Sequence, residues 1–188
     1  MENIDRRSRR TKDLLLSTFK EMMMKHDDYM EISVTELCEK ADVSRRSFYT
    51  HYSELDDLFK QMQTEAIKRF FALIKDFDVF ADIHKVVQAF FEINTGDPVY
   101  EKMLLSNHYN YVRASSANEF VSMLGRFEKM NGINHNPKYI KVVLIDIYYQ
   151  ICAICYRNWI KLEKKIPQEN MIDLAANLIK GGISPYVI

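Results

Sequence analysis

The sequence predicts an all-α protein of about nine helices. Glycine (5 residues) and proline (4) together make up about 5% of the 188 residues, against roughly 12% in ordinary proteins. A chain with so few turn-forming residues does not suit a many-stranded sandwich or barrel. Apolar residues recur instead at helical spacing, and no segment alternates as a β-strand does. The length is sufficient for one large domain or two small ones with a sizeable core.

Three helices are predicted at the N-terminal end. The first spans about residues 4–25 and carries an apolar stripe. That stripe is formed by Leu15, Phe19, Met22 and Met23. Ser33 and Glu36 have the spacing of a capping box, which predicts a short helix over 34–41. Residues 42–44 then predict a tight turn, and Ser44 caps a second short helix over 45–51.

The remaining helices are longer, and their starting signals become weaker along the chain. Ser53 and Asp56 form a capping signal that opens a long helix, whose one face carries Phe59, Met62, Ala66, Phe70 and Leu73. Further helices are expected near 82–94, 97–108, 114–130, 137–163 and 168–180. Asn and Gly with Pro mark loops over 94–98 and 131–137.

Composition and termini indicate a soluble, cytoplasmic protein with no membrane partner. Three cysteines do not make a disulfide framework, and the first residues contain no apolar signal core. The longest apolar stretch, residues 142–156, is interrupted by Asp146 and Gln150 and is shorter than the ~20 residues of a membrane-spanning helix. A composition that is 47% apolar and 12% aromatic also argues against disorder.

The net charge of zero hides a strong local segregation of charge. Residues 6–12 carry five positive charges, residues 43–51 carry two, and residues 27–42 have a net charge of −5. The overall balance therefore excludes only a broad, non-specific basic surface. The first cluster, which includes Arg6, Arg7, Arg9 and Arg10, could be a solvated helix start. We favour the interpretation that this cluster is an N-terminal arm that lies along the phosphates of DNA or in its minor groove.

The two short helices and their turn have the pattern of a helix-turn-helix. Leu37, Cys38 and Ala41 would face the second helix, which would bury Phe48. The other face of the second helix then presents hydrogen-bond donors at Arg45, Arg46, Ser47, Tyr49, Thr50 and His51. A helix carrying such groups can enter the major groove of DNA.

Residues 32–58 closely resemble the DNA-binding signature of the tetracycline-repressor (TetR) family. The matched positions are Leu37, Ala41, Val43, Ser44, Ser47, Phe48, Tyr49, His51, Tyr52 and Leu58. The resemblance is specific over about the first 60 residues, with a fainter echo at 156–159 and 166–167. Two positions depart from the family pattern, because the usual turn glycine is Asp42 and the usual lysine opening the fourth helix is Leu55.

The resemblance implies an all-α homodimer built from two domains. Residues 1–53 would form a three-helix helix-turn-helix domain that binds a palindromic double-stranded DNA operator. Residues 54–188 would form a domain for ligand binding and dimerisation, with 54–75 as a connecting helix. An unknown small-molecule effector would release a repressor from its operator. The two departures motivate an alternative, in which a co-regulator or ligand-binding module keeps the fold but has lost direct operator binding.

The resemblance also assigns roles by position. Tyr49 and His51 would contact phosphates, while Arg45, Arg46, Ser47 and Thr50 would face bases or nearby phosphates. Ser44 and the four arginines at 6–10 complete the candidate DNA-binding set.

The C-terminal part predicts a ligand pocket and a dimer interface. The candidate pocket residues are Phe91, Met103, His108, Tyr109, Met123, Phe127, Tyr148, Tyr149 and Cys152. The helix over 137–163 is apolar on two faces, which suits burial against a core on one side and a partner on the other. The candidate interface residues are Ile147, Ile151, Ile154, Trp159, Leu174 and Leu178.

No motif points to an enzyme, a cofactor or a metal. The sequence contains no glycine-rich nucleotide loop, no nucleophile elbow and no His/Glu set at metal-ligand spacing. Cys152 and Cys155 have CxxC spacing, but on an apolar helix they are expected to be core residues.

Overall fold

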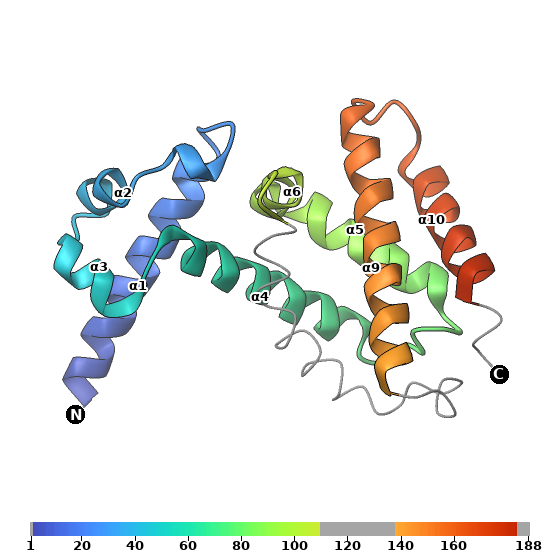
Figure 1. The fold of residues 1–188 in the computed structure, drawn as a ribbon, viewed down its shortest axis with the longest axis horizontal. Helices are drawn as coiled ribbons and strands as arrows, with labels where there is room; N and C mark the ends of the chain where they lie inside the picture. Colours follow the sequence, from blue (N-terminus) through green and yellow to red (C-terminus); the bar gives the residue numbers. More distant parts are fainter. Residues whose placement is uncertain (1, 110–137, 184–188) are drawn as a thin grey trace. The chain divides into compact units, whose positions relative to one another are not determined.

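The computed structural model describes residues 2–109 and 138–183. Within these residues the chain forms eight α-helices, one 3₁₀ helix and no β-strand, which confirms the predicted all-α class (Figure 1). The helix expected over 114–130 lies outside the described residues, as do the pocket candidates Met123 and Phe127. Contacts group the described residues into two compact units, residues 2–65 with 98–109, and residues 66–97 with 138–183.

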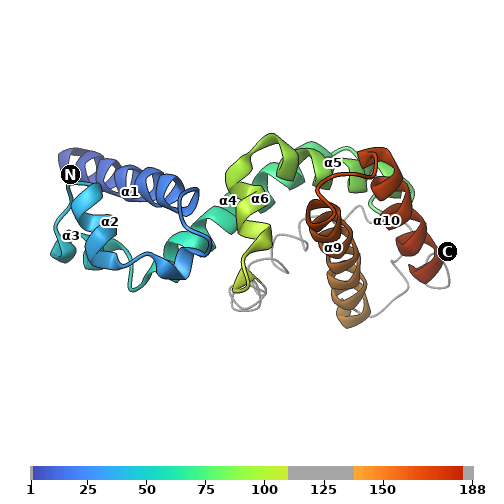
Figure 2. The same ribbon diagram turned by 90° about the horizontal axis from the view of Figure 1, so that it is seen from above.

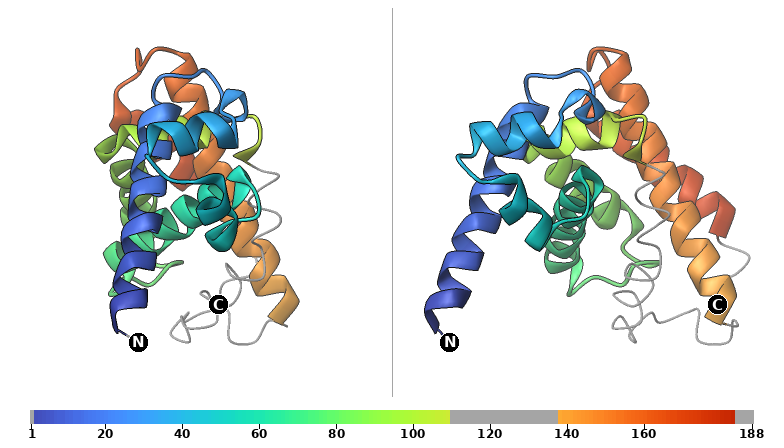
Figure 3. Two further views of the ribbon diagram at one scale, coloured as in Figure 1. Left: turned by 90° about the vertical axis from the view of Figure 1, so that its left-hand side faces the viewer. Right: turned by 60° about the vertical axis from the view of Figure 1, so that its left-hand side comes forward.

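The first unit contains the three predicted N-terminal helices. These are α1 (Glu2–Met23), α2 (Val34–Lys40) and α3 (Arg45–His51), and each lies within one to two residues of its predicted bounds. The first part of α4 (Leu55–Ile74) and α6 (Pro98–Leu105) complete the unit. Figure 3 shows α1, α2 and α3 from two further directions.

The core of the first unit is drawn from every one of its α-helices. Its fully buried side chains include the predicted stripe of α1 and Phe48 of α3. The main members are Leu15, Phe19, Met22, Met23, Leu37, Phe48, Leu58, Phe59, Met62, Met103 and Leu104. The apolar pattern therefore predicted correctly which side of each N-terminal helix faces inward.

A short 3₁₀ helix, η1 (Tyr29–Glu31), was not predicted from the sequence. The ring of Tyr29 is buried and stacks on Phe59 with ring centroids 4.4 Å apart. Its hydroxyl donates to Oδ1 of Asp56 at 2.8 Å. Asp56 is therefore engaged by η1, and it is Asp57 whose carboxylate accepts from the backbone N–H of Ser53 at 2.7 Å. The predicted capping interaction at the start of α4 therefore forms, but Asp57 provides the carboxylate in place of Asp56.

The second unit packs α5 (Ile83–Gly96), α9 (Lys138–Lys161) and α10 (Gln168–Ile183) together with the end of α4 (Figure 2). Phe90, Phe91, Tyr156 and Trp159 form an aromatic cluster in its core. The Trp159 indole N–H donates to the carbonyl of Ile166 at 2.7 Å, which ties the connection before α10 to α9. This grouping divides α4 after Glu65, and the domain boundary expected at residue 53–54 stays a prediction.

Candidate nucleic-acid interface

The turn between α2 and α3 has a defined hydrogen-bonding geometry. The N–H of Val43 donates to the carbonyl of Cys38 at 2.9 Å, and that of Asp42 donates to the carbonyl of Glu39 at 3.3 Å. This pair of bonds is a Schellman motif, which closes a helix by placing one residue in the left-handed region. Asp42 is that residue, with φ of 52°. Asp42 therefore stands where the family pattern has a glycine, and a residue with a side chain adopts this left-handed backbone conformation only with strain.

Two serines fix where the helices of the pair begin. The hydroxyl of Ser33 accepts from the N–H of Glu36 at 3.1 Å, and the hydroxyl of Ser44 accepts from the N–H of Ser47 at 3.1 Å. Both predicted N-caps are confirmed. The carboxylate of Glu36 lies 3.8 Å from Nε2 of His26, so its interaction in this structure is with the loop that precedes α2.

The outer face of α3 presents polar side chains to solvent. Phe48 is fully buried, whereas Arg45, Arg46 and Thr50 are exposed and Tyr49 has 52% of its surface accessible. Ser47 and His51 are partly exposed. Within the part of the chain that the structure describes, neither arginine forms an ion pair. Because the Thr50 hydroxyl donates to the carbonyl of Arg46 at 3.0 Å, it is a weaker candidate for base contact than the two guanidinium groups.

The N-terminal cations lie on a helix. Residues 6–10 belong to α1, and Arg6, Arg7, Arg9 and Arg10 are all exposed and form no ion pair among the described residues. Arginine side chains that extend from a helix can contact phosphates or enter a minor groove, so both forms of the arm interpretation stay predictions.

The two departures from the family pattern sit at opposite ends of α3. Asp42 is exposed at the turn before it, and Leu55 is partly buried as the first residue of α4. A cavity of about 350 Å³ lies beside the turn, lined by Thr35, Cys38, Glu39, Asp42, Val43, Ser44 and Arg45. Burial raises the pKa of the Cys38 thiol, so this side chain stays neutral and packs as a small apolar group.

The candidate pocket residues are distributed over both units. In the first unit Met103 and Tyr109 are buried, and the rings of His108 and Tyr29 meet edge-on at 6.4 Å. In the second unit Phe91, Tyr148 and Cys152 are buried, and Tyr149 contacts Phe90 edge-on. The Tyr148 hydroxyl donates to the carbonyl of Ile83 at 3.1 Å, which gives it a structural partner. The pocket assignment stays a prediction.

Helix α9 has two apolar faces, as its sequence predicts. One face is buried in the second unit and includes Leu144, Tyr148, Cys152, Cys155, Tyr156 and Trp159. The other face and the adjacent surface of α10 leave large apolar side chains 44–54% exposed, at Val143, Ile147, Ile154, Leu174 and Leu178. Ile151 is partly exposed on the same stripe. Trp159 differs from the other interface candidates because it is only 5% exposed and belongs to the core.

Comparison with known proteins places this geometry in a known architecture. No protein-family model matches the chain. A solved structure of a candidate TetR family transcription regulator from Shewanella sp. PV-4 superposes with a TM-score of 0.64, covering 92% of this chain and 97% of that one at 12% identity. This chain has the TetR fold. The resemblance noted in residues 32–58 is thus matched by an arrangement of helices over most of the chain.

A second comparison concerns about a third of the chain. An uncharacterized HTH-type transcriptional regulator of Bacillus subtilis (strain 168), YxbF, is 31% identical over 61 residues. The match covers 32% of this chain and only 16% of the length of YxbF.

One contact that supports the interface was missed in the sequence. The hydroxyl of Tyr52, directly after α3, donates to Oε1 of Gln61 on α4 at 2.9 Å. Burial, with smaller contributions from nearby carboxylates, raises the pKa of Tyr52 to about 12. The Tyr52 position was part of the family pattern, but nothing in the spacing indicated Gln61 as its partner.

Among the described residues of this TetR fold, no helix combines the length and apolar character needed to cross a membrane.

Proposed function

We propose that this protein is a DNA-binding transcription regulator that contacts its operator through α3. The observation that carries the proposal is the division of α3 between a fully buried Phe48 and an exposed face with Arg45, Arg46 and Tyr49. Guanidinium groups suit bidentate contact with guanine and also bind phosphates. The match to an HTH-type regulator over 61 residues and the TetR fold support the same conclusion.

The proposal includes a homodimer that recognises a palindrome. A helix-turn-helix monomer contacts only a few base pairs, and a two-fold dimer places two recognition helices on half-sites one helical turn apart or a multiple of it. The exposed apolar stripes of α9 and α10 support the dimer, because contiguous apolar surface on soluble proteins marks interaction sites. Residues of this surface would pair with the same residues of a second copy.

The proposal also includes control by a small molecule, in which the protein without this ligand acts as a repressor. A ligand changes occupancy of the operator only by binding the operator-competent conformation less tightly than the alternative. The many buried aromatic and methionine side chains of the described residues supply the type of wall that apolar ligands contact.

Fluorescence anisotropy on the full chain tests DNA binding directly. Labelled fragments from upstream of the gene itself are titrated with protein at two salt concentrations, against a shuffled fragment of equal composition. Specific binding that weakens steeply with salt is expected, since α1 and α3 would neutralise phosphates. Absence of binding even at low salt would contradict the proposal.

The second candidate function is a co-regulator that has kept the fold without operator binding. Asp42 and Leu55 favour it, because they place a carboxylate and an apolar side chain where the family pattern has a glycine and a lysine. Footprinting separates the two candidates, since a co-regulator protects no DNA on its own.

A further inference from the structure

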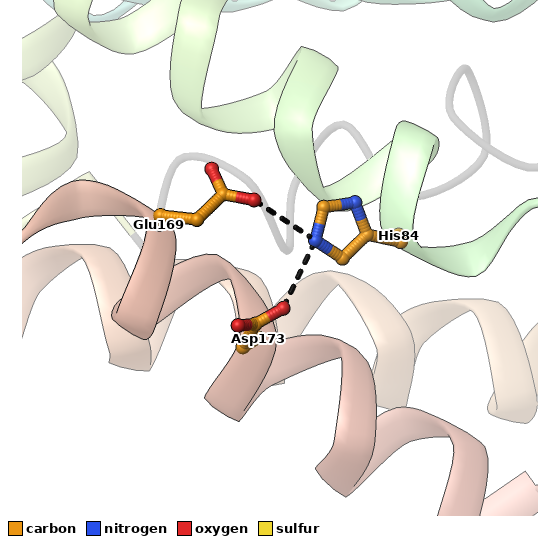
Figure 4. A group of neighbouring side chains, drawn as sticks. All are labelled: His84, Glu169 and Asp173. Carbon is orange, nitrogen blue, oxygen red and sulfur yellow. Dashed lines mark hydrogen bonds and ion pairs between the residues drawn. The ribbon is translucent and has the colours of Figure 1, made fainter.

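In the second unit, two carboxylates of α10 converge on one ring nitrogen of a histidine of α5. His84 is the second residue of α5, while Glu169 and Asp173 lie one turn apart at the start of α10. Nε2 of His84 is 3.0 Å from Oδ1 of Asp173 and 3.4 Å from Oε1 of Glu169 (Figure 4). We propose that His84, Glu169 and Asp173 form a binding site for a divalent transition-metal ion of the zinc type.

The spacing of the ligand atoms suits a shared metal ion. Zinc binds imidazole nitrogen and carboxylate oxygen at about 2.0–2.2 Å. Two ligands at about 2.1 Å from one ion are about 3.0 Å apart when they subtend a right angle and about 3.4 Å apart at the tetrahedral angle. The two nitrogen–oxygen distances match these values, and all three ligand atoms lie within 4.8 Å of one another.

The imidazole of His84 cannot donate a full hydrogen bond to both carboxylates. An imidazole nitrogen carries at most one proton, yet two carboxylates face Nε2 of His84. Glu169 and Asp173 are also like charges four residues apart on one helix, which is an unfavourable pairing. A divalent cation bound by neutral imidazole would neutralise both carboxylates at once.

The three ligands stand on well-packed parts of α5 and α10. Ile83 beside His84 is 9% exposed, and Met171 and Ile172 between the two carboxylates are buried. Lys85, the nearest cation in sequence, lies 2.8 Å from the carboxylate of Asp82, the N-cap residue of α5. The ligands themselves are partly exposed, with 43–66% of each side chain accessible. Water can therefore complete the coordination sphere of a bound ion. Zinc accepts mixed nitrogen and oxygen donors and fits this set of ligands better than calcium or magnesium, because these two ions prefer oxygen.

His26 of the first unit provides a matched control. It also lies between two carboxylates, but Glu31 approaches its Nδ1 at 3.4 Å and Glu36 approaches its Nε2 at 3.8 Å. The two nitrogens point away from each other, so no single ion can bind both carboxylates through this ring. The comparison separates a converging set of ligands from a histidine that is simply surrounded by acidic groups.

Isothermal titration of Zn²⁺ into the full-length chain, without a polyhistidine tag and after removal of metal by a chelator, tests the site. One ion per chain with micromolar affinity is expected. His84→Gln and Asp173→Asn should each weaken binding at least about tenfold, whereas His26→Gln should leave it unchanged. Wild-type affinity no higher than that of His84→Gln, or an equal loss in His26→Gln, would overturn the proposal.

Two further measurements keep the outcome unambiguous. The spectrum of the Co²⁺-loaded chain should show nitrogen and oxygen coordination, and a thiolate charge-transfer band would overturn the proposal by placing the metal on cysteine. Metal-free melting temperatures establish that the variants are folded. Should His84→Gln fail to fold, Glu169→Gln removes one exposed ligand with its size retained, and its Zn²⁺ affinity is expected to fall in the same way.

Discussion

The hydroxyl of Tyr29 donates a 2.8 Å hydrogen bond to the carboxylate of Asp56, while the Tyr29 ring stacks on Phe59. This contact joins the 3₁₀ helix η1 to the first turn of α4 within the unit that carries the helix-turn-helix. Burial, followed by the bond to Asp56, raises the pKa of Tyr29, so the hydroxyl remains a donor at any physiological pH. The ring provides apolar packing, and the hydroxyl ties η1 to the first turn of α4.

Tyr29→Phe is expected to destabilise the protein by about 1 kcal/mol, because it removes one hydrogen bond to a charged acceptor and keeps the ring. The corresponding drop in melting temperature is about 2–4 °C for a chain of this size. Thermal unfolding followed by circular dichroism measures it. Tyr49→Phe removes a hydroxyl from an exposed side chain and should leave the melting temperature unchanged; an equal effect in both variants would contradict the role of Asp56.

Arg46→Ala and Tyr49→Ala should each weaken operator binding about tenfold, because Arg46 would lose a contact with a base or a nearby phosphate and Tyr49 a contact with a phosphate. Both side chains are exposed on α3, so neither change should lower the melting temperature. Anisotropy titrations together with thermal unfolding measure the two effects. Lys161→Ala removes an exposed cation from α9 and serves as the control for net charge. Loss of folding in the two α3 variants would instead make these side chains structural.

Asp42 sits at φ of 52° at the end of α2, next to the proposed DNA-binding face. Asp42→Gly and Asp42→Ala both remove a carboxylate there, so both should tighten operator binding at low salt. Only glycine adopts this conformation without strain, and we expect Asp42→Ala to be less stable than Asp42→Gly by about 1 kcal/mol. Urea denaturation and anisotropy measure the two quantities separately. Equal stability of the two variants would contradict the strained turn.

Ile154→Glu and Leu178→Glu should convert the proposed dimer into a monomer of 22.3 kDa. Both side chains are about half exposed in the isolated chain, so the glutamates are tolerated there. In a dimer they would bury unpaired charge, which is strongly unfavourable. Light scattering coupled to size-exclusion chromatography measures the mass. Met24→Glu, at an exposed apolar site in the first unit, should leave the mass unchanged; a monomeric wild type would refute the interface.

The stability of the protein should fall as the pH rises from about 10 to about 12. Burial raises the pKa of Tyr52 to about 12, against about 10 in an unfolded chain. In this interval the unfolded state releases the phenolic proton while the folded state retains it, so deprotonation favours unfolding. The stabilising contribution is complete below pH 10 and is lost above 12. Urea midpoints across this range measure the slope, and Tyr52→Phe should reduce it while Tyr49→Phe should not.

Local signals in the sequence determined much of the N-terminal unit. The caps at Ser33 and Ser44, the inward direction of Phe48 and the turn at Asp42 depend on residues within a few positions of one another. The two apolar faces of α9 could also be predicted from the sequence, because helical periodicity alone separates Leu144 and Tyr148 from Val143 and Ile147. Interactions of this range leave a pattern in the sequence.

The tertiary structure decided what depends on residues far apart in the chain. The partner of Tyr29 is 27 positions away, and its hydrogen bond with Asp56 shifted the cap of α4 to Asp57. Packing also decided which of the two apolar faces of α9 is buried, because Trp159 clusters with Phe91 in the core and lies on the same helical face as Tyr148. His84 and Asp173 are 89 positions apart and meet only because α5 packs on α10. The sequence by itself determined the class of the fold and the resemblance of residues 32–58 to the TetR pattern, whereas long-range packing decided which side chains meet.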